Sequence, residues 1–439
     1  MHGVVRRFAA MGVRQGDVQA RMMMDPAVRA DPVPFYDELR ERVAGDGPLI
    51  RCRVSYVTVD HALAQELLRS DDFRVIKLGA NLPGPLRRLE ERTRPQALHP
   101  LRPPSLLAVE PPEHTRYRKT VSSVFTARAV AALRERVRDT ADALLDEMAA
   151  AGTGSSAVVD VVDRYCSQLP VTVISEVLGV PEPERPRVLE FGEAAAPSLD
   201  IGLSWSQYRA VDGGLESFNE WLTTHLAELR RNPGDDLMSQ LIRVAEDSPG
   251  STPLLDDLEL RATAGLVLAA GFETTVNLLG NGIRMLMDAP DQLALLREDP
   301  QLWPNAVEEI LRLDSPVQLS ARVALRDVEL AGTRIRRDEM VAIYLAAANR
   351  DPGVFPDPHR FDVTRPNAGR HLAFSGGRHF CLGAALARAE GEVGLRAFFE
   401  RFPQAEPAGT GQRRDTRVLR GWSTLPVRLG PEVSAARPA

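Results

Sequence analysis

The feature that most constrains the fold is a run of helical apolar spacing over residues 114–311, nearly half of the chain. Apolar side chains recur there at intervals of three and four, as in Val130, Leu133, Val137, Leu144 and Leu145. This spacing places them on one face of an α-helix, and scattered prolines divide the run into separate helices. A β-rich segment follows at 314–344, where the short strands Val328–Leu330 and Thr333–Ile335 flank a turn. The sequence predicts a mainly α fold with a small β lobe.

Size and composition restrict the class of protein. Of the 439 residues, 44% are hydrophobic and 26% are charged, as is typical of a soluble globular chain. The net charge of −6 argues against a nucleic-acid-binding protein, which would normally carry a basic surface. No stretch of about 18 consecutive apolar residues occurs, so no transmembrane anchor is expected. The three cysteines, Cys52, Cys166 and Cys381, suit neither a disulfide scaffold nor a zinc site, and they fit a reducing cytoplasm.

No linker divides the chain into separate domains. We expect an N-terminal extension over residues 1–26, a single large domain over 27–430 and a C-terminal tail over 431–439. Residues 1–24 mix apolar side chains with arginines, as an amphipathic helix on a membrane surface would. An ordinary surface helix or a frayed terminus is the favoured alternative for this segment.

Local signals predict three further elements. Residues 49–53 and 56–59 form a short hairpin, and Asp60 caps a helix that ends at Arg69. Residues 78–112 are rich in proline, but their leucines make them too apolar for simple disorder. We expect this segment to form a loop that lines a cavity.

A glycine-rich loop over residues 374–383 holds the last cysteine, Cys381, and a helix is predicted to begin near Leu382. The N–H groups and the dipole at a helix start stabilise a thiolate. Glycines in such a loop let the backbone approach a flat ligand closely. A lone cysteine at this place also fits a buried structural residue beside a helix start, so the loop alone leaves both interpretations open.

The pattern Phe-x-x-Gly-x-x-x-Cys-x-Gly over residues 374–383 resembles the haem-binding loop of the cytochrome P-450 family, and Leu386-Ala387-Arg388 extends the likeness. The resemblance implies a single large domain that encloses a b-type haem. Cys381 would be the axial thiolate ligand of the iron, and Phe374, Gly377 and Gly383 would surround the haem from the same loop. A thiolate ligand pushes electron density toward cleavage of the O–O bond.

The likeness covers the chain from about Asp31 to the C-terminal region, and it is nearest to soluble actinobacterial, mycobacterial members. One position departs from the family pattern, because Ser375 stands where many bacterial members have glycine. This departure concerns the geometry of the loop and not the identity of the ligand.

Segment 269–275 resembles the oxygen-binding helix of the family, which has a small-Gly-x-acid-Thr element. By this likeness Gly271 leaves space for dioxygen beside the iron, and the Thr274 hydroxyl hydrogen-bonds to the distal oxygen. Glu273 would relay protons from solvent as a general acid. Taken alone, the segment also fits a notch of small residues used in helix packing.

Two further sets of residues resemble the family pattern. Glu309 and Arg312 share one helix face, and the likeness adds Arg360 to them as a buried structural cluster behind the haem. The other set would bind the haem propionates, because arginine recognises carboxylates through a planar fork of donors. This set comprises His114, Arg118, Arg322 and His379.

The resemblance implies a monooxygenase that inserts one oxygen atom of O2 into an unactivated C–H bond and thereby hydroxylates its substrate. The chain has no flavin or nicotinamide fingerprint, so electrons are expected from a ferredoxin that a ferredoxin reductase supplies. An acidic partner of this kind would meet a basic surface. The residues expected to form that surface are Arg116, Lys119, Arg370 and Arg378.

The expected substrate is a hydrophobic small molecule such as a lipid, a terpenoid or a polyketide side chain, because the residues placed around the pocket by resemblance are largely apolar. They are Leu82, Leu86, Leu106, Leu199, Ile201, Trp205, Leu266, Val317 and Leu319. Ordinary core packing is the alternative for each of them.

Three other functions remain open. A peroxygenase would use hydrogen peroxide directly, but such members typically lack the acid–threonine pair that Glu273 and Thr274 form here. A haem-based gas sensor or carrier would bind the cofactor without catalysis, and it would normally need an output module. A haem-free helical binding protein is the least favoured, because so many positions match a haem site.

Overall fold

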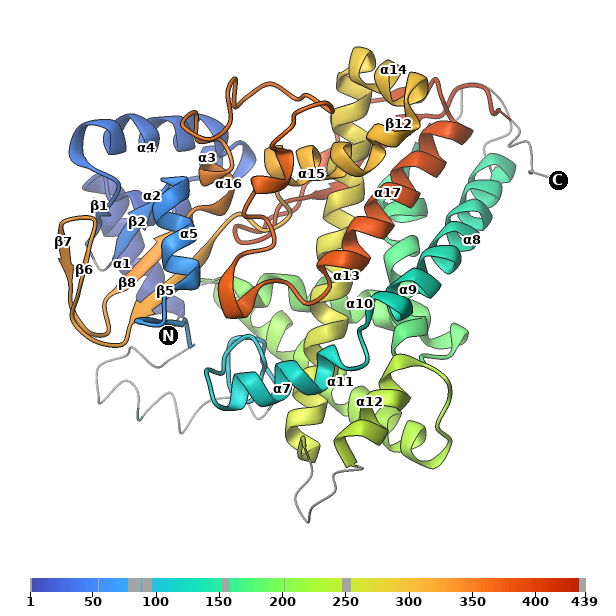
Figure 1. Ribbon diagram of the computed structural model, residues 1–439, viewed down its shortest axis with the longest axis horizontal. Coiled ribbons are helices and arrows are strands. Elements are labelled where there is room, and N and C mark those ends of the chain that lie inside the picture. The colour runs from blue at the N-terminus through green and yellow to red at the C-terminus, as the bar shows by residue number, and fades with distance from the viewer. Residues whose placement is uncertain are drawn as a thin grey trace.

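The computed structural model describes residues 2–53, 55–77, 88, 97–151, 158–200, 202–246 and 254–433. Helices dominate the molecule, and a small β-sheet lies beside the helical body, at the left of Figure 1. The predicted mainly α fold with a small β lobe is confirmed.

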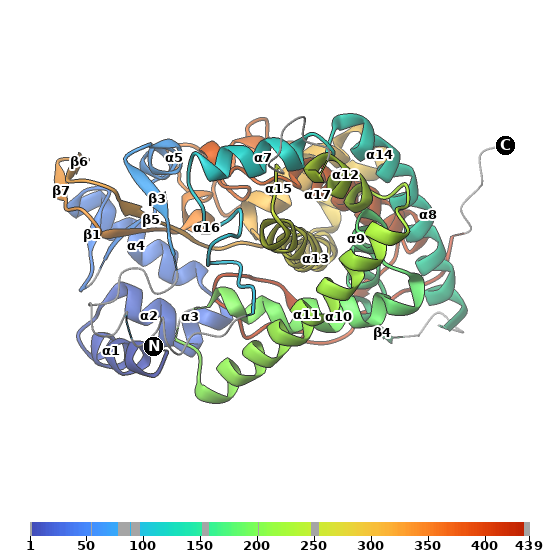
Figure 2. The same ribbon diagram turned by 90° about the horizontal axis from the view of Figure 1, so that it is seen from below.

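Helix α13 (Asp257–Asp288) runs through the middle of the helical body, and Figure 2 shows it nearly end-on. Its first turn has a capping box, in which the Asp256 side chain accepts from the Glu259 N–H and the Glu259 side chain accepts from the Asp256 N–H. The helices of the body around it are α7 (Glu113–Ser122), α8 (Ala127–Ala151), α9 (Gln168–Val177), α10 (Arg185–Ala195), α11 (Trp205–Arg231), α12 (Leu237–Glu246), α14 (Pro290–Glu298), α15 (Trp303–Leu313) and α17 (Ala384–Arg401).

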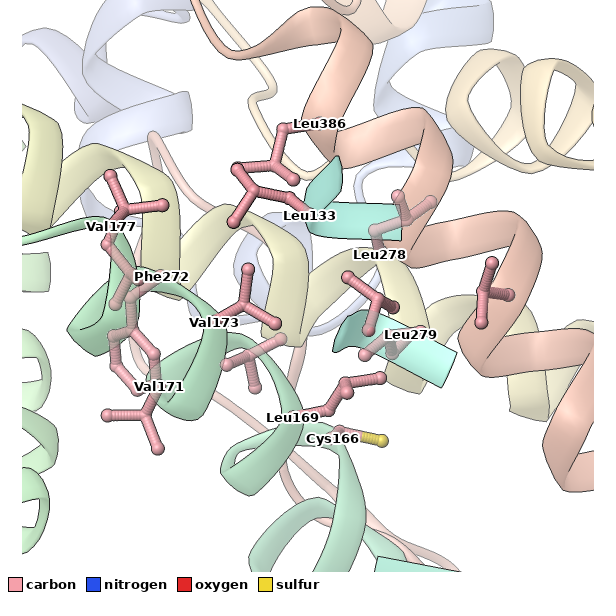
Figure 3. Packing of buried hydrophobic residues seen from close by; sticks show 14 of the residues in the cluster. Leu133, Cys166, Leu169, Val171, Val173, Val177, Phe272, Leu278, Leu279 and Leu386 are labelled. Carbon is pink, nitrogen blue, oxygen red and sulfur yellow. The ribbon is translucent and has the colours of Figure 1, made fainter. Parts of the chain in front are cut away.

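Helices α13 and α17 approach each other closely because glycines lie at their contact. A Cβ atom on Gly282 of α13 would lie 2.8 Å from Leu395 Cδ1, and one on Gly394 of α17 would lie 2.9 Å from Leu279 Cδ2. Both distances are too short for real Cβ atoms, so a larger residue at either glycine would force the facing leucine side chain or the helices to shift. Figure 3 shows the buried side chains around this contact, including Leu169 of α9 and Leu278 of α13.

The main sheet has five strands in the order β1-β2-β8-β5-β3. Strands β2 and β8 are parallel, and the other neighbours are antiparallel. The strands are β1 (Ile50–Arg51), β2 (Tyr56–Thr58), β3 (Phe73–Val75), β5 (Ser320–Ala324) and β8 (Met340–Ile343). Helices α4 (Val33–Asp46), α5 (His61–Arg69) and α16 (Leu345–Ala348) lie beside this sheet.

The local predictions for this lobe are confirmed. The hairpin is β1–β2, and the Asp60 side chain caps α5 by accepting from the Leu63 N–H at 2.8 Å. The described part of the chain also forms three smaller sheets. Their strands are β4 (Val158–Asp160), β12 (Pro426–Arg428) and β9 (Glu406–Pro407), then β10 (Gln412–Arg413) and β11 (Trp422–Thr424), then β6 (Val328–Leu330) and β7 (Thr333–Ile335).

The N-terminal segment forms α1 (His2–Arg14), α2 (Val18–Met24) and α3 (Pro26–Ala30). Val18 and Met22 of α2 belong to the same buried cluster as Phe35 and Leu39 of α4. The boundary predicted at residue 26 therefore does not coincide with an edge of packing, because α2 is part of the core of the lobe.

Helix α13 is, among the described helices, the one that is long and apolar enough to cross a membrane. In its most apolar window 67% of the residues are buried inside the protein, as expected of a core helix.

A buried ionic cluster joins α15 to the segment that follows α16. Arg312 donates to both carboxylate oxygens of Glu309, at 2.6 and 2.8 Å, and the two side chains are completely buried. The third member is Arg365, whose Nε donates to Glu309 Oε1 at 3.0 Å. The prediction that Arg360 fills this place is wrong. The Arg360 side chain is exposed, and only its backbone carbonyl faces the cluster, where it accepts from Arg312 and Arg365.

We expect Arg365→Ala to destabilise the protein by about 3–5 kcal/mol, because it leaves part of the buried Glu309 charge uncompensated. Arg360→Ala should change the free energy of unfolding by less than about 0.5 kcal/mol, because an exposed side chain is lost and its carbonyl stays. Denaturant unfolding measures both effects. A larger loss in the Arg360 variant would contradict this assignment.

Candidate active site

A cavity of about 470 Å³ lies between α13 and the cysteine loop. Gly271 and Thr274 line it from α13, and Phe374, Cys381 and Gly383 line it from the loop. The two segments predicted to face each other across a flat cofactor therefore lie on opposite walls of one cavity, although about 100 residues separate them in sequence.

The backbone fixes the position of Cys381. Its N–H donates to the Phe374 carbonyl at 3.0 Å, which closes the loop on itself. Burial raises the pKa of the Cys381 thiol, although a hydrogen bond from the Gly383 N–H and the charges of Arg118 and Arg388 act in the opposite direction. A metal ion bound to the sulfur would reverse this balance, because coordination deprotonates a thiol.

The loop needs left-handed backbone at two positions. Gly377 has φ +65°, and a Cβ there would lie 2.4 Å from the Leu68 carbonyl oxygen, so only glycine fits. Ser375 has φ +62° although it carries a side chain. The left-handed conformation explains why glycine suits the position that Ser375 occupies.

Hydrogen-bonding groups converge on the edge of the cavity. Among the described residues, His114 Nε2 and Arg322 Nη2 are buried and lack a hydrogen bond. His379 Nε2 is also buried, and it lies 3.5 Å from Glu110 Oε2. All three residues line the cavity, and so does Arg118, whose Nη1 donates to the Phe380 carbonyl at 2.8 Å. Buried polar groups are normally paired, so this set fits a ligand that carries carboxylates. The residues present therefore fit the propionates of a haem.

Electrostatics support the same fit. Burial, followed by the neighbouring His379, lowers the pKa of His114 to about 4. Burial also lowers the pKa of Arg322 to about 10. Burial opposes the charged form of both groups, and an anionic ligand would compensate for it. Burial acts to raise the pKa of Glu110 at the rim, but hydrogen bonds from His379 and from the Val75 N–H, together with the charges of His379 and Arg378, lower this pKa to about 2.

The wall of the cavity formed by α13 differs from the prediction in two details. The Thr274 hydroxyl donates to the Ala270 carbonyl at 2.8 Å, and the side chain faces the cavity as expected. A Cβ on Gly271 would lie 3.0 Å from Ile174 Cδ1, so this glycine also permits the close approach of α9. Glu273 does not line the cavity. Its carboxylate is buried against Arg414, with Oε1 3.0 Å from the Arg414 Nε, and burial raises its pKa to about 7.

The sequence did not lead us to Glu390, which lines the cavity from α17. The side chain is 2% exposed, and burial raises its pKa to about 8 against the effect of a hydrogen bond with Thr275. The Thr275 hydroxyl donates to the Gly271 carbonyl at 3.1 Å, so a neutral Glu390 can donate to Thr275 in turn. The sequence does contain a signal for Glu390, because this acid stands between Leu386 and Val393 on the face of α17 that is otherwise apolar and faces inward.

The predicted apolar lining is confirmed in part. Five of the predicted residues line the cavity, namely Leu106, Leu199, Leu266, Val317 and Leu319. The prediction for Trp205 is wrong, because this residue is the first of α11, lies on the outside of the protein and is 73% exposed. Leu82, Leu86 and Ile201 lie outside the described residues, as does most of the loop predicted over 78–112.

We expect Ser375→Gly to stabilise the protein by roughly 0.5–1 kcal/mol. Glycine adopts the left-handed conformation of this position without the steric cost that serine has there. Part of this gain is lost because glycine also makes the unfolded chain more flexible. Ser375→Ala is the matched control, since it removes the hydroxyl and keeps the Cβ. Denaturant unfolding should show a gain for glycine only. Equal behaviour of the two variants would mean that Ser375 is not strained.

Glu390 should make stability fall as pH rises. Its pKa is raised in the folded protein, so its contribution is complete below the unfolded value near 4.5 and is lost as pH rises toward about 8. Between pH 5.5 and 7.5, the unfolding free energy of the wild type relative to Glu390→Gln should decrease by at most about 1.4 kcal/mol per pH unit. The control is Glu392→Gln on the same helix, where Glu392 pairs with Arg134. A difference that does not change with pH would rule out a neutral Glu390.

Comparison with known proteins agrees with this geometry. The family model described as cytochrome P-450 matches residues 198–426. Among solved structures, the ligand-free CYP164A2 of Mycobacterium smegmatis superposes with a TM-score of 0.80 at 33% identity, covering 94% of this chain and 99% of that one. P-450 BioI in complex with an acyl carrier protein gives a TM-score of 0.81 at 30% identity, covering 91% of this chain and 99% of that one.

Relatives by sequence are closer still. A putative cytochrome P-450 140 of Mycobacterium tuberculosis is 70% identical over 438 residues, which is 100% of this chain and 98% of that protein. The 6-deoxyerythronolide B hydroxylase of Saccharopolyspora erythraea is 47% identical over 324 residues, which is 73% of this chain and 76% of that one. The Cys381 loop, the convergent carboxylate-binding residues and these relatives lead to one conclusion: the chain belongs to the cytochrome P-450 family of haem-thiolate monooxygenases.

Proposed function

We propose that this monooxygenase hydroxylates an unactivated C–H bond of a hydrophobic small molecule, with O2 and with electrons from a ferredoxin and its reductase. The observation that supports this most is the single cavity walled by Cys381 on one side and by Gly271 and Thr274 on the other. A thiolate and a hydroxyl-bearing helix on opposite faces of one haem suit oxygen activation better than reversible binding.

The proposed cofactor is a b-type haem. Cys381 would be its axial ligand, and His114, Arg322 and His379, with Arg118, would bind its propionates. Phe374 also lines the cavity, and the Arg388 guanidinium lies 4.6 Å from the centre of the Phe374 ring, which holds that ring in place. When bound, the haem supplies the binding and activation of dioxygen.

The distal residues would handle protons and water. The Thr274 hydroxyl faces the cavity, and it could donate a hydrogen bond into the cavity if it released the Ala270 carbonyl. Glu273 lies behind it and has a pKa near neutrality, a property that suits proton transfer. Glu390 and Thr275 form a second buried acid–hydroxyl pair that reaches the same cavity.

The hydrophobic substrate is proposed from the walls of the cavity, which are mainly leucine, valine, alanine and methionine side chains. The names of two relatives also indicate hydrophobic substrates for those proteins. They include the 6-deoxyerythronolide B hydroxylase and a vitamin D(3) 25-hydroxylase of Pseudonocardia autotrophica, which is 40% identical over 339 residues. A lipid, terpenoid or polyketide substrate fits both observations. A cytoplasmic location is proposed because Cys52, Cys166 and Cys381 are unpaired thiols.

The test is oxygen-isotope labelling with the reconstituted system. The haem-loaded protein, a ferredoxin, its reductase and NADPH are incubated under 18O2 with macrolide aglycones, sterols and fatty acids. Under 18O2 we expect a product that carries one 18O atom. When the water is labelled and the O2 is not, the product should carry no label. Product formed from hydrogen peroxide but never from reduced ferredoxin would establish the peroxygenase alternative. Tight binding and efficient reduction with no product would favour a sensor or carrier.

Two of the four arginine and lysine residues predicted to dock ferredoxin are already engaged within the protein. Arg116 makes two hydrogen bonds to Glu259, at 2.7 and 2.8 Å, and Arg378 pairs with Asp71 and Glu110. Lys119 and Arg370 are exposed, and neither has an acidic partner in the described part of the chain. We therefore assign ferredoxin attraction to Lys119 and Arg370.

The double variant Lys119→Glu, Arg370→Glu should slow the first electron transfer from ferredoxin by about tenfold or more at low salt, and the difference should shrink as salt rises. Arg334→Glu, on the distant β6–β7 hairpin, is the control for a change in net charge. Stopped-flow reduction of the haem measures the rate. If the double variant and the control reduce equally fast, the ferredoxin binds elsewhere.

A further inference from the structure

We propose that the N-terminal helix α2 is a wall of the substrate cavity, and that Arg417, held beside it by Asp200, donates to a hydrogen-bond acceptor at the far end of an elongated, mostly apolar substrate. This inference rests on the proposed function and adds a substrate shape to it. It assigns a role to a segment that the sequence had set apart as an N-terminal extension.

Three residues of α2 line the cavity: Gln19, Met22 and Met23. Their spacing is i, i+3 and i+4, so they share one helix face. Val18 and Met22 also pack into the buried cluster with α4, which fixes how the helix is rotated. One face of α2, and not a single side chain, therefore forms part of the cavity wall.

The position of α2 is held from several sides. Arg21 donates to both oxygens of Glu38 on α4, at 2.7 Å each. The Asp17 side chain, which caps α2, also accepts from the Arg53 N–H at 2.7 Å. Such a network gives α2 a fixed place at the cavity, as a specificity-determining wall requires.

A polar pair lies where α2 meets the segment after β10. Arg417 and Asp200 both line the cavity, with Arg417 Nε 3.6 Å from Asp200 Oδ2. Asp200 is 3% exposed and accepts from the N–H groups of Arg417 and Val418. Arg417 Nη1 donates to the Met23 carbonyl at 2.7 Å, so the pair is tied to α2 itself.

An ion pair at this place has a cost, because removing charges from water is unfavourable unless they gain equivalent partners. The side chains around it include those of Leu199, Val418 and Leu419, which are apolar, so the compensation for Asp200 comes from backbone N–H groups and from Arg417. A guanidinium has five N–H donors. The contacts with Asp200 and the Met23 carbonyl leave donors of Arg417 for an acceptor inside the cavity.

The ligand class follows from these neighbours. The body of the molecule must be apolar to match the cavity walls, and its end must offer oxygen acceptors such as a carboxylate or carbonyl group to Arg417. The methionines of α2 suit such a chain, because thioether side chains adapt their shape to a flexible apolar ligand.

Met22 is a poor choice for mutation. With Arg417 and Leu419 it also lines a small second pocket, so at this point the wall is one side chain thick. Gln19→Ala and Met23→Ala are better probes, because both side chains are only partly buried. Met24→Ala is the matched control, since Met24 is the adjacent methionine of the same helix and does not line the cavity.

The experiment uses two series of imidazoles that bind the haem iron through nitrogen and extend a chain into the cavity. One series ends in a methyl group, the 1-alkylimidazoles, and the other ends in a carboxylate, the ω-(imidazol-1-yl)alkanoic acids. Spectral titration of the haem Soret band in the haem-loaded protein gives a dissociation constant for each. In the wild type, affinity should rise with chain length, and at one length the acid should bind about tenfold more tightly than its methyl counterpart.

Gln19→Ala and Met23→Ala should weaken the long-chain ligands by about fivefold and leave 1-methylimidazole unchanged, whereas Met24→Ala should change neither. Arg417→Gln should abolish the preference for the carboxylate. If Arg417→Gln fails to fold, Arg417→Lys retains the charge without the guanidinium fork and should reduce that preference.

Binding of 1-methylimidazole separates this inference from the proposed function. Its failure to perturb the Soret band of the wild type would refute a haem site open to ligands, and with it the proposed function. If 1-methylimidazole binds normally but the α2 variants match Met24→Ala at every chain length, or Arg417→Gln keeps the carboxylate preference, the inference is overturned and the proposed function stands.

Discussion

The structure depends on a close helix crossing that leaves a cavity at one end. Helices α13 and α17 meet through Gly282 and Gly394, where even a methyl group would collide with a leucine. This contact fixes the distance between the helix that carries Thr274 and the helix that follows Cys381. The packing that makes the core continuous therefore also sets the width of the active site.

The cavity in turn leaves polar groups that the protein itself does not satisfy. His114 and Arg322 bring buried nitrogen atoms without hydrogen-bond partners to one edge of it, His379 lies beside them, and Cys381 lies at its wall. Each such group disfavours folding until a ligand compensates for it. A carboxylate-bearing haem compensates for all of them at once, so the cofactor and the folded state should stabilise each other.

Sequence patterns were reliable where one element or one loop determines the outcome. The Asp60 cap, the turn between β6 and β7 and the cysteine loop are local, and their residues lie where the spacing predicted. Contacts between distant segments were less predictable. Arg360 and Arg365 are five residues apart on one wrapping segment, and only the folded backbone shows that Arg365 reaches Glu309 while Arg360 points to solvent.

The same limit applies inside the cavity. Glu390 lies on a helix whose apolar spacing hides a single acid, and nothing local shows that this acid faces Thr275. The family resemblance places Trp205 in the lining, yet its position in the first turn of α11 turns it outward. Helix α2 reaches the cavity only through pairing with α4 and with Arg417, a residue almost 400 positions later.

The most direct test of a haem-thiolate site at Cys381 is the spectrum of the reduced protein with carbon monoxide. We expect a Soret band displaced far to the red of an imidazole-ligated haem in the wild type, because the sulfur donates electron density to the iron. Cys381→Ser should lose that band, while Cys52→Ser and Cys166→Ser should keep it. A red-displaced band that persists in the Cys381→Ser protein would contradict the assignment of the ligand.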